Sequence, residues 1–346
     1  VNSSASNSRA LTVTTGSGNV TFTGVVGGGT NGALGALTVN STGTTTFSAA
    51  VTAASVTTNA SGTTAINGST ITTTGAQTYN DAVTLGADTT LTATTVTFND
   101  TVTGAYALTI TGNAVFGNGT ADTVTLSGSA KALSVSGTST INANITTSGG
   151  QTYTGATTLG AAVTLSASSI TTGSTFNAST YAATLTTDAI ALGGNVSGSG
   201  AATLTIQPKT DATTIAIGSA ATGTLKLDDA ELAYLQDGFT SITIGSTTGT
   251  GAIAVAYTTP YTFLDPLTIR SNTSGGGAIS ATSALNTGTN SLTITSGGAV
   301  SVAAITSGAL AITGTGITLN GNITTSGTQS YTCLLYTSPS PRDATL

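Results

Sequence analysis

A stretch at residues 71–85 constrains the fold most, because the chain repeats it. It reads ITTTGAQTYNDAVTL, and it returns at residues 145–159 as ITTSGGQTYTGATTL. A third copy begins at Ile323 as ITTSGTQSYT and stops matching after Thr332. Repeats of this kind indicate similar units that stack on one another, since a single unit cannot bury its own apolar face.

Each unit is built from short strands that start with Leu-Thr-Val or Leu-Thr-Ile. Apolar residues alternate with Thr or Ser in these segments, which sends Leu, Val and Ile to one face of a strand and Thr to the other. Successive starts are separated by 18 to 26 residues or by longer gaps that resemble multiples of one unit. The starts lie at Leu11, Leu37, Leu108, Leu204, Leu267 and Leu292, with variants at Leu133 and Leu310.

Composition favours strands throughout the chain. Charged residues make up 5% of the chain, and His, Met and Trp are absent, whereas about 25% charge is usual. Thr and Val suit a pleated sheet because their branched Cβ packs well there. The mean hydropathy of +0.29 excludes a polar disordered chain.

Short strands separated by Gly, Asn and Ser fit either an antiparallel sandwich or barrel, or a parallel β-helix. Tight hairpin turns such as Asn67-Gly68 are few, and the repeat is shorter than a sandwich domain. Stacked Thr, Ser and Asn can also form uncharged ladders between coils. We therefore predict an all-β parallel β-helix.

One segment departs from the strand pattern, at residues 225–239, which read LKLDDAELAYLQDGF. Asp228 is placed as an N-cap, and Glu231 three residues later completes a capping box. Gly238 is placed as a C-cap. We expect a helix of two to three turns near 228–237, packed on the flank of the β-helix through Leu232 and Leu235.

The last residues differ in chemistry from all that precede them. Residues 333–343 read CLLYTSPSPRD and hold the single Cys and two of the five Pro. This string resembles an in-frame translation of a sequencing adapter, so we predict that residues 333–346 are an artefactual tail. We expect the preceding chain to be a fragment with repeats at 1–198, a helix-bearing module at 199–274 and repeats at 275–332.

Two blocks resemble a known class of proteins. The first is ITTTGAQTYNDAVTLGADTTL at 71–91, and the second runs from LTIQP at Leu204 through GTLKLDDAELAYLQDGFTSITIG to FLDPLTIRS. Both are similar to repeat modules of filamentous-haemagglutinin-like adhesins and autotransporter-type passengers, which are giant bacterial surface proteins. The resemblance implies a right-handed parallel β-helix, export to the bacterial cell surface, and a role in adhesion or biofilm.

Residues able to do chemistry are scarce. The chain has no His, and its 12 acidic residues are mostly isolated, so the usual bases and nucleophiles of enzymes are missing. The one acidic cluster comprises Asp228, Asp229, Glu231 and Asp237. It is either a cation site or carboxylate pair, or a capped helix with a solvated face, and we favour the second. We predict no catalytic, cofactor or metal site.

Two repeated polar patterns are further candidates for function. Tyr79, Tyr153 and Tyr331 each follow a Gln by two residues (Gln77, Gln151, Gln329). Each Tyr either forms part of an exposed carbohydrate-stacking row or, as we favour, packs at a coil corner with its hydroxyl in water. The Thr-x-Thr runs suggest ice binding as a third hypothesis. The spacing between these runs varies along the sequence, which argues against a flat ice-binding lattice.

The favoured function is a non-enzymatic structural and adhesive stalk of a large secreted or surface-exposed bacterial protein. A carbohydrate-binding or carbohydrate-active β-helix is the alternative, and an ice-binding solenoid is a more distant one. The partner would be a host-cell, carbohydrate or neighbouring-cell ligand. With six basic residues and a net charge of −6, we expect no nucleic-acid partner. No apolar run reaches the roughly 18 residues that span a bilayer, so we expect no membrane insertion.

Overall fold

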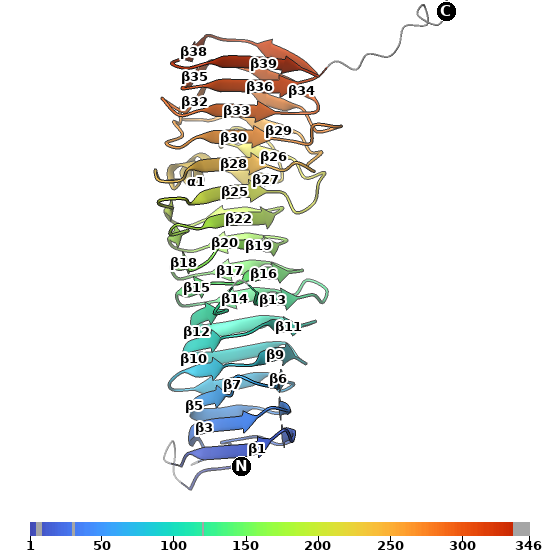
Figure 1. Ribbon diagram of the computed structural model, residues 1–346, viewed down its shortest axis with the longest axis vertical. Helices are drawn as coiled ribbons and strands as arrows, with labels where there is room; N and C mark the ends of the chain where they lie inside the picture. Colours follow the sequence, from blue (N-terminus) through green and yellow to red (C-terminus); the bar gives the residue numbers. More distant parts are fainter. Residues whose placement is uncertain (5–8, 30–31, 120, 335–346) are drawn as a thin grey trace, which may run out of the picture. The chain divides into compact units, whose positions relative to one another are not determined.

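A computed structural model of the chain describes residues 1–4, 9–29, 32–119 and 121–334 (Figure 1). Two compact units divide it, Val1–Ala202 and Thr203–Leu346. Of the tail predicted at 333–346, only Cys333 and Leu334 belong to the described residues. The prediction about the remainder therefore lies outside them.

Unit 1 consists of short strands that pair in parallel with the strands of the coils before and after them (Figure 1). One sheet comprises β1 (Leu11–Gly16), β3 (Leu34–Ser41), β5 (Val51–Thr58), β7 (Thr70–Thr73), β8 (Gln77–Tyr79), β10 (Thr89–Phe98), β12 (Leu108–Phe116), β14 (Leu133–Val135), β15 (Ser139–Ile141), β17 (Gln151–Tyr153), β18 (Thr157–Leu159), β20 (Ile170–Thr172), β21 (Phe176–Asn177), β23 (Ile190–Leu192) and β24 (Val196–Ser197). The facing ladder comprises β2 (Val20–Phe22), β4 (Thr44–Phe47), β6 (Thr63–Ile66), β9 (Ala82–Leu85), β11 (Val102–Gly104), β13 (Thr123–Leu126), β16 (Asn144–Thr147), β19 (Val163–Ala167) and β22 (Ala182–Thr187).

Unit 2 has three parallel ladders. The first comprises β25 (Thr203–Gln207), β28 (Ser241–Gly245), β30 (Leu267–Arg270), β33 (Leu292–Thr295), β36 (Leu310–Gly314) and β39 (Gln329–Cys333). The second comprises β27 (Leu225–Leu227), β26 (Ile215–Ile217), β29 (Ile253–Val255), β31 (Ile279–Ala281), β34 (Ala299–Val302) and β37 (Gly316–Leu319), and the third β32 (Leu285–Asn286), β35 (Ile305–Ser307) and β38 (Ile323–Thr325). Both units are parallel β-solenoids, which confirms the predicted fold class.

The register stacks like on like, as the repeated strand starts predict. Leu11 pairs with Leu37, and Leu108 pairs with Leu133. In unit 2, Leu267, Leu292 and Leu310 form one column. These leucines are buried, except for the partly exposed Leu11. Each buried Leu or Ile contributes about 1.5–3 kcal/mol by leaving water, and the contribution accumulates coil by coil.

Aromatic side chains also stack between successive coils of unit 1. The rings of Phe22 and Phe47 lie 5.3 Å apart and nearly parallel. Tyr79, Phe98 and Phe116 form a second stack with centroid spacings of 5.3 and 5.9 Å. Stacked rings of this kind fill the interior and favour one register over a slipped one.

The outward Thr side chains form columns that the sequence spacing does not suggest. One column runs through six paired strands of unit 1 with no missing hydroxyl, at Thr70, Thr90, Thr109, Ser134, Thr152 and Thr171. The turns absorb the unequal spacing in sequence, so strand positions stay aligned. Unequal spacing in sequence therefore does not prevent hydroxyls from aligning in a column. Ice binding itself stays a hypothesis, which a thermal hysteresis measurement would test.

Some Thr side chains point inward, against the simple alternation of apolar and polar faces. Thr58 and Thr64 are buried around the buried carboxylate of Asp81 and donate hydrogen bonds to it. Thr73 and Thr147 are buried at coil corners, where each hydroxyl donates to the carbonyl of the second residue onward. Inward polar groups therefore gather where the backbone turns and its own polar groups need partners.

The predicted helix exists but is shorter than expected. Helix α1 spans Asp229–Ala233, with Asp228 as N-cap and both halves of the capping box present. Leu232 and Leu235 are buried, as predicted. The prediction of two to three turns ending at Gly238 is wrong. The helix ends at the C-cap Tyr234. There the Tyr234 N–H donates to the Glu231 carbonyl and the Leu235 N–H donates to the Leu232 carbonyl, and these three-residue spacings replace the four-residue spacing of an α-helix.

Candidate functional site

Asp228 and Glu231, two of the four clustered acidic residues, cap the helix. The Asp228 carboxylate accepts a hydrogen bond from the Glu231 N–H at 2.9 Å. The Glu231 carboxylate accepts one from the Asp228 N–H at 2.9 Å. These reciprocal bonds satisfy donors that a helix start leaves free. Helix capping therefore accounts for the positions of both Asp228 and Glu231.

Asp229 joins the helix to two loops. Its carboxylate accepts hydrogen bonds from the Ser219 N–H, from the N–H and hydroxyl of Thr258, and from the Thr259 N–H. Desolvation opposes ionisation here, but the hydrogen bonds outweigh it and lower the pKa of Asp229 to about 2. An ionised carboxylate with these four hydrogen bonds holds helix α1 against the two loops.

Asp237 lies apart from the helix caps and acts on Asp265 of the next coil. Burial raises the pKa of Asp265, hydrogen bonds from the Gly238 and Phe239 N–H groups lower it, and repulsion from Asp237 raises it again. Asp265 is buried, whereas Asp237 is exposed. The four predicted acidic residues therefore have three separate structural settings rather than one shared site.

The repeated Gln-x-Tyr pattern lies inside the solenoid in its first two copies. Tyr79 and Tyr153 are fully buried, and each hydroxyl donates to the preceding Gln Oε1 at 3.0 Å. Burial raises the pKa of both hydroxyls, and the charge of Asp81 adds to the effect at Tyr79. For these two residues the exposed stacking row is wrong. The favoured hypothesis is right that each Tyr packs inside the coil and wrong that its hydroxyl lies in water.

The buried Gln side chains link each corner to the next coil. Gln77 Nε2 donates to the carbonyls of Ile71 and Thr92, both at 3.0 Å. Gln151 Nε2 donates in the same way to Ile145 at 3.0 Å and Ser166 at 3.1 Å. The amide thus hydrogen-bonds to backbone carbonyls of two successive coils, and its own donors are satisfied inside the solenoid. The Gln amide therefore stabilises the stacking of successive coils.

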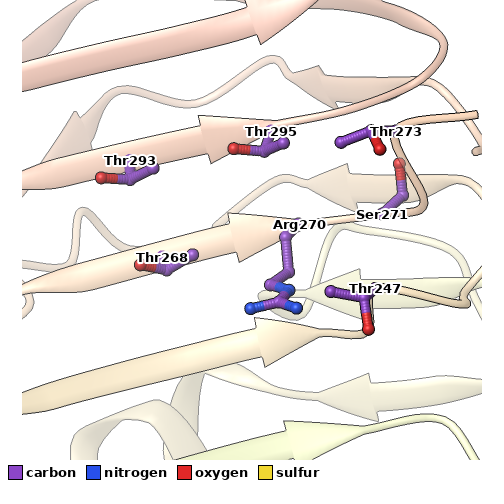
Figure 2. Close-up of a pocket in the computed structure, with 7 residues that line it drawn as sticks. All are labelled: Thr247, Thr268, Arg270, Ser271, Thr273, Thr293 and Thr295. Carbon is purple, nitrogen blue, oxygen red and sulfur yellow. The ribbon is translucent and has the colours of Figure 1, made fainter.

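Unit 2 carries a groove that the sequence did not suggest, with a cavity volume of about 250 Å³. It lies at the ends of β28, β30 and β33, and Figure 2 shows the Arg270 side chain reaching across the surface toward Thr247. It is lined by Thr247, Thr268, Arg270, Ser271, Thr273, Thr293 and Thr295. The missed signal is a substitution within the pattern, because Leu-Thr-Ile-Arg at Leu267 replaces the Leu-Thr-Ile-Thr found at Leu292.

A required glycine keeps the floor of this groove open. Gly245 pairs with Arg270 on the neighbouring strand and has a φ of +104°. A Cβ at Gly245 would lie 2.0 Å from the Arg270 carbonyl oxygen. No side chain therefore rises beside Arg270 on that strand, and the guanidinium has room to extend.

A second depression, of about 230 Å³, is lined by Tyr257, Thr258, Pro260, Ser283 and Ala284. Two of its hydroxyls are already engaged, whereas the buried Tyr257 hydroxyl has no hydrogen-bond partner among the described residues. The Thr258 hydroxyl donates to Asp229, and the Ser283 hydroxyl accepts from the Tyr257 N–H. Burial raises the pKa of the Tyr257 hydroxyl, and its aromatic ring packs on Tyr261.

Within the described ranges, no three or more His, Cys, Asp or Glu side chains are grouped to hold a metal ion. No helix there is long and apolar enough to cross a membrane. Comparisons with protein-family models, with curated proteins and with solved structures found no match to the chain. The resemblance to adhesin repeats therefore stays a prediction, whereas the β-solenoid repeat is established by the coils themselves.

Proposed function

We propose that this chain is a structural and adhesive segment of a large secreted or surface-exposed bacterial protein. One observation carries the proposal: the repeated motif uses its distinctive side chains to stack coils. Gln77 and Gln151 each bridge two coils, and the tyrosines beside them are buried. Repetition of this kind supports length and rigidity, since stability grows with each neighbour added.

The adhesive part of the proposal rests on the family resemblance of residues 71–91 and on the uncharged, hydroxyl-rich outer faces. Its ligand would belong to a host cell, a carbohydrate or a neighbouring cell, and its location would be the bacterial cell surface. These faces offer many weak hydrogen-bonding groups, which gain strength when several chains engage one surface together.

A bead assay tests the adhesive role. Beads coated with the full chain should be retained under flow on lawns of bacteria or on animal-cell monolayers. Beads coated with heat-unfolded chain at equal density are the matched control. Equal retention of the two kinds of bead, or retention no better than on albumin-coated beads, would contradict the proposal.

The second candidate is a carbohydrate-binding β-solenoid, which the Arg270 groove specifically favours. A carbohydrate-active version would use Asp228 or Asp237. Asp228 is occupied as a helix cap, which leaves Asp237 as the residue to test. Polysaccharide turnover that disappears in Asp237→Ala would support this version, and turnover unchanged in that variant would remove it.

A further inference from the structure

The Arg270 groove combines an unpaired cation with unpaired hydroxyls. Within the described part of the chain, the Arg270 guanidinium makes no ion pair and no hydrogen bond, although its side chain is half-buried. By contrast, Lys131 of unit 1 forms an ion pair with Asp88 at 2.9 Å. A half-buried guanidinium presents a planar fork of donors that matches a carboxylate.

The threonines around Arg270 are equally available. The hydroxyls of Thr247, Thr268, Thr273, Thr293 and Thr295 make no hydrogen bond to the described protein. The Ser271 hydroxyl differs, because it donates to the Gly277 carbonyl at 2.9 Å and contacts Ser296. Ser271 therefore supports the groove wall, while the threonines face its open space (Figure 2).

The threonines are also arranged in a fixed pattern. Thr268 pairs with Thr293, and Arg270 pairs with Thr295, on adjacent parallel strands. Neighbouring strands lie about 4.8 Å apart, and alternate residues along one strand lie roughly 6.6 Å apart. The backbone positions of Arg270 and the three threonines thus mark the corners of a small rectangle on the sheet, and the guanidinium extends from its corner toward Thr247 (Figure 2).

We propose that this groove binds the carboxylate and ring hydroxyls of an acidic sugar, a hexuronate residue within a polysaccharide. The guanidinium donates two parallel N–H···O bonds to the carboxylate, and the threonine hydroxyls exchange hydrogen bonds with the sugar hydroxyls. The volume of about 250 Å³ is below the roughly 300–1,000 Å³ of drug-sized sites. It therefore suits one sugar residue with the chain continuing outside.

Charge also selects the ligand class. One guanidinium matches one negative charge, whereas phosphate monoesters carry nearly two at neutral pH. The Asp211 carboxylate accepts a hydrogen bond from the hydroxyl of Thr248, which is the neighbour of the groove-lining Thr247. The protein's own negative charge at this loop would repel a bound anion. A singly charged carboxylate is tolerated better there than a phosphate. Since no aromatic residue lines the groove, we expect a dissociation constant on the order of 1 mM for a single sugar.

The inference rests on the adhesive part of the proposed function and gives it a ligand. Saturation-transfer NMR on the full chain tests it with a matched pair of probes, methyl β-glucuronide and methyl β-glucoside. These share the ring hydroxyls and differ at the carboxylate. We expect transfer to the glucuronide and at least about fivefold less to the glucoside.

Variants tie the signal to the groove. Arg270→Gln should weaken glucuronide binding about fivefold, and Arg270→Lys should weaken it less because it keeps the charge but loses the fork. Arg9→Gln removes an exposed arginine of unit 1 and should leave binding unchanged. Circular dichroism should show that every variant keeps the sheet content of the parent chain.

Several results would overturn the inference. Absence of transfer to the glucuronide, equal transfer to the glucoside, or unchanged binding in Arg270→Gln would each do so. Inorganic sulfate is also added at a lower concentration than the glucuronide. Displacement of the glucuronide under that condition would show a general anion site instead. The bead assay separates the two proposals. Bead retention together with NMR binding that is unchanged in Arg270→Gln rejects only the groove, whereas Arg270-dependent NMR binding without bead retention rejects only the adhesive function.

Discussion

The second and third copies of the repeated motif have the same local structure but different surroundings. In both, the Tyr hydroxyl donates to the preceding Gln Oε1, at 3.0 Å for Tyr153 and 2.8 Å for Tyr331. Yet Tyr153 is fully buried, whereas Tyr331 is 41% exposed. The motif therefore specifies its own turn and its own Gln–Tyr pair, and burial depends on the coil that follows.

The Gln side chains show what a following coil adds. Gln151 bridges to Ser166 on the next coil at 3.1 Å. Gln329 donates instead within its own motif, to the Thr325 hydroxyl at 2.9 Å. In the described part of the chain, β39 pairs only with β36. One sequence motif can therefore serve as an interior joint or as an exposed edge, according to what is stacked on it.

The largest difference in stability between the two copies is expected when the Gln side chain is removed. Gln151→Ala removes the two amide hydrogen bonds to the carbonyls of Ile145 and Ser166 and leaves the buried Tyr153 hydroxyl without its Gln partner, so it should lower the free energy of unfolding by about 3–5 kcal/mol. Gln329→Ala should lower it by less than about 0.5 kcal/mol, since its site is exposed. Urea unfolding followed by circular dichroism measures both, and similar losses would refute the contrast.

A smaller contrast is expected from the hydroxyl alone. Tyr153→Phe keeps the ring packing and removes one buried hydrogen bond, so it should cost about 1 kcal/mol. Tyr331→Phe is the matched control at an exposed copy and should change stability by less than about 0.5 kcal/mol. The same urea titration applies. A neutral Tyr153→Phe would mean that the buried pair contributes nothing beyond packing.

The buried carboxylate of Asp81, which lies within the first copy of the motif, should make unit 1 sensitive to pH. Burial raises the pKa of Asp81, hydrogen bonds from Thr58 and Thr64 partly lower it, and the charge of Asp100 raises it. Because the folded pKa is above the unfolded value, this group stabilises the fold below about pH 4 and loses that contribution as pH rises through the folded pKa.

Asp81→Asn should therefore gain stability relative to the parent between pH 4 and pH 7, as measured by thermal unfolding at each pH. Asp88→Asn is the control with the opposite sign. A hydrogen bond from the Ala107 N–H and the pairing with Lys131 hold the pKa of Asp88 below its usual value. Its contribution is present above about pH 4 and is lost as pH falls. Equal pH profiles for the two variants would contradict these assignments.

The coil interior was largely predictable from the sequence, whereas corners and surface were not. The column of Leu267, Leu292 and Leu310 follows from repeated strand starts, and the N-cap Asp228 follows from a local capping pattern. Both depend on neighbours in sequence or on a simple period. The burial of Tyr153 depends on a strand about one coil further on, which no local pattern encodes.

The Arg270 groove illustrates the same limit. Its lining comes from three strands and their following loops, and unequal turns set which of those residues meet. The replacement of Thr by Arg in a repeated Leu-Thr-Ile-Thr segment was the available signal. Its meaning required knowing that the paired position is Gly245 and that the Arg270 guanidinium has no partner among the described residues.

Nitration of tyrosine by tetranitromethane, located by peptide mass spectrometry, tests the central claim most directly. The claim is that the repeated motif is an interior joint, exposed only where no coil covers it. The folded chain should be nitrated at Tyr331 while Tyr79 and Tyr153 stay unmodified, and all three should react after unfolding in urea. Nitration of Tyr79 or Tyr153 in the folded chain, as fast as that of Tyr331, would contradict the account.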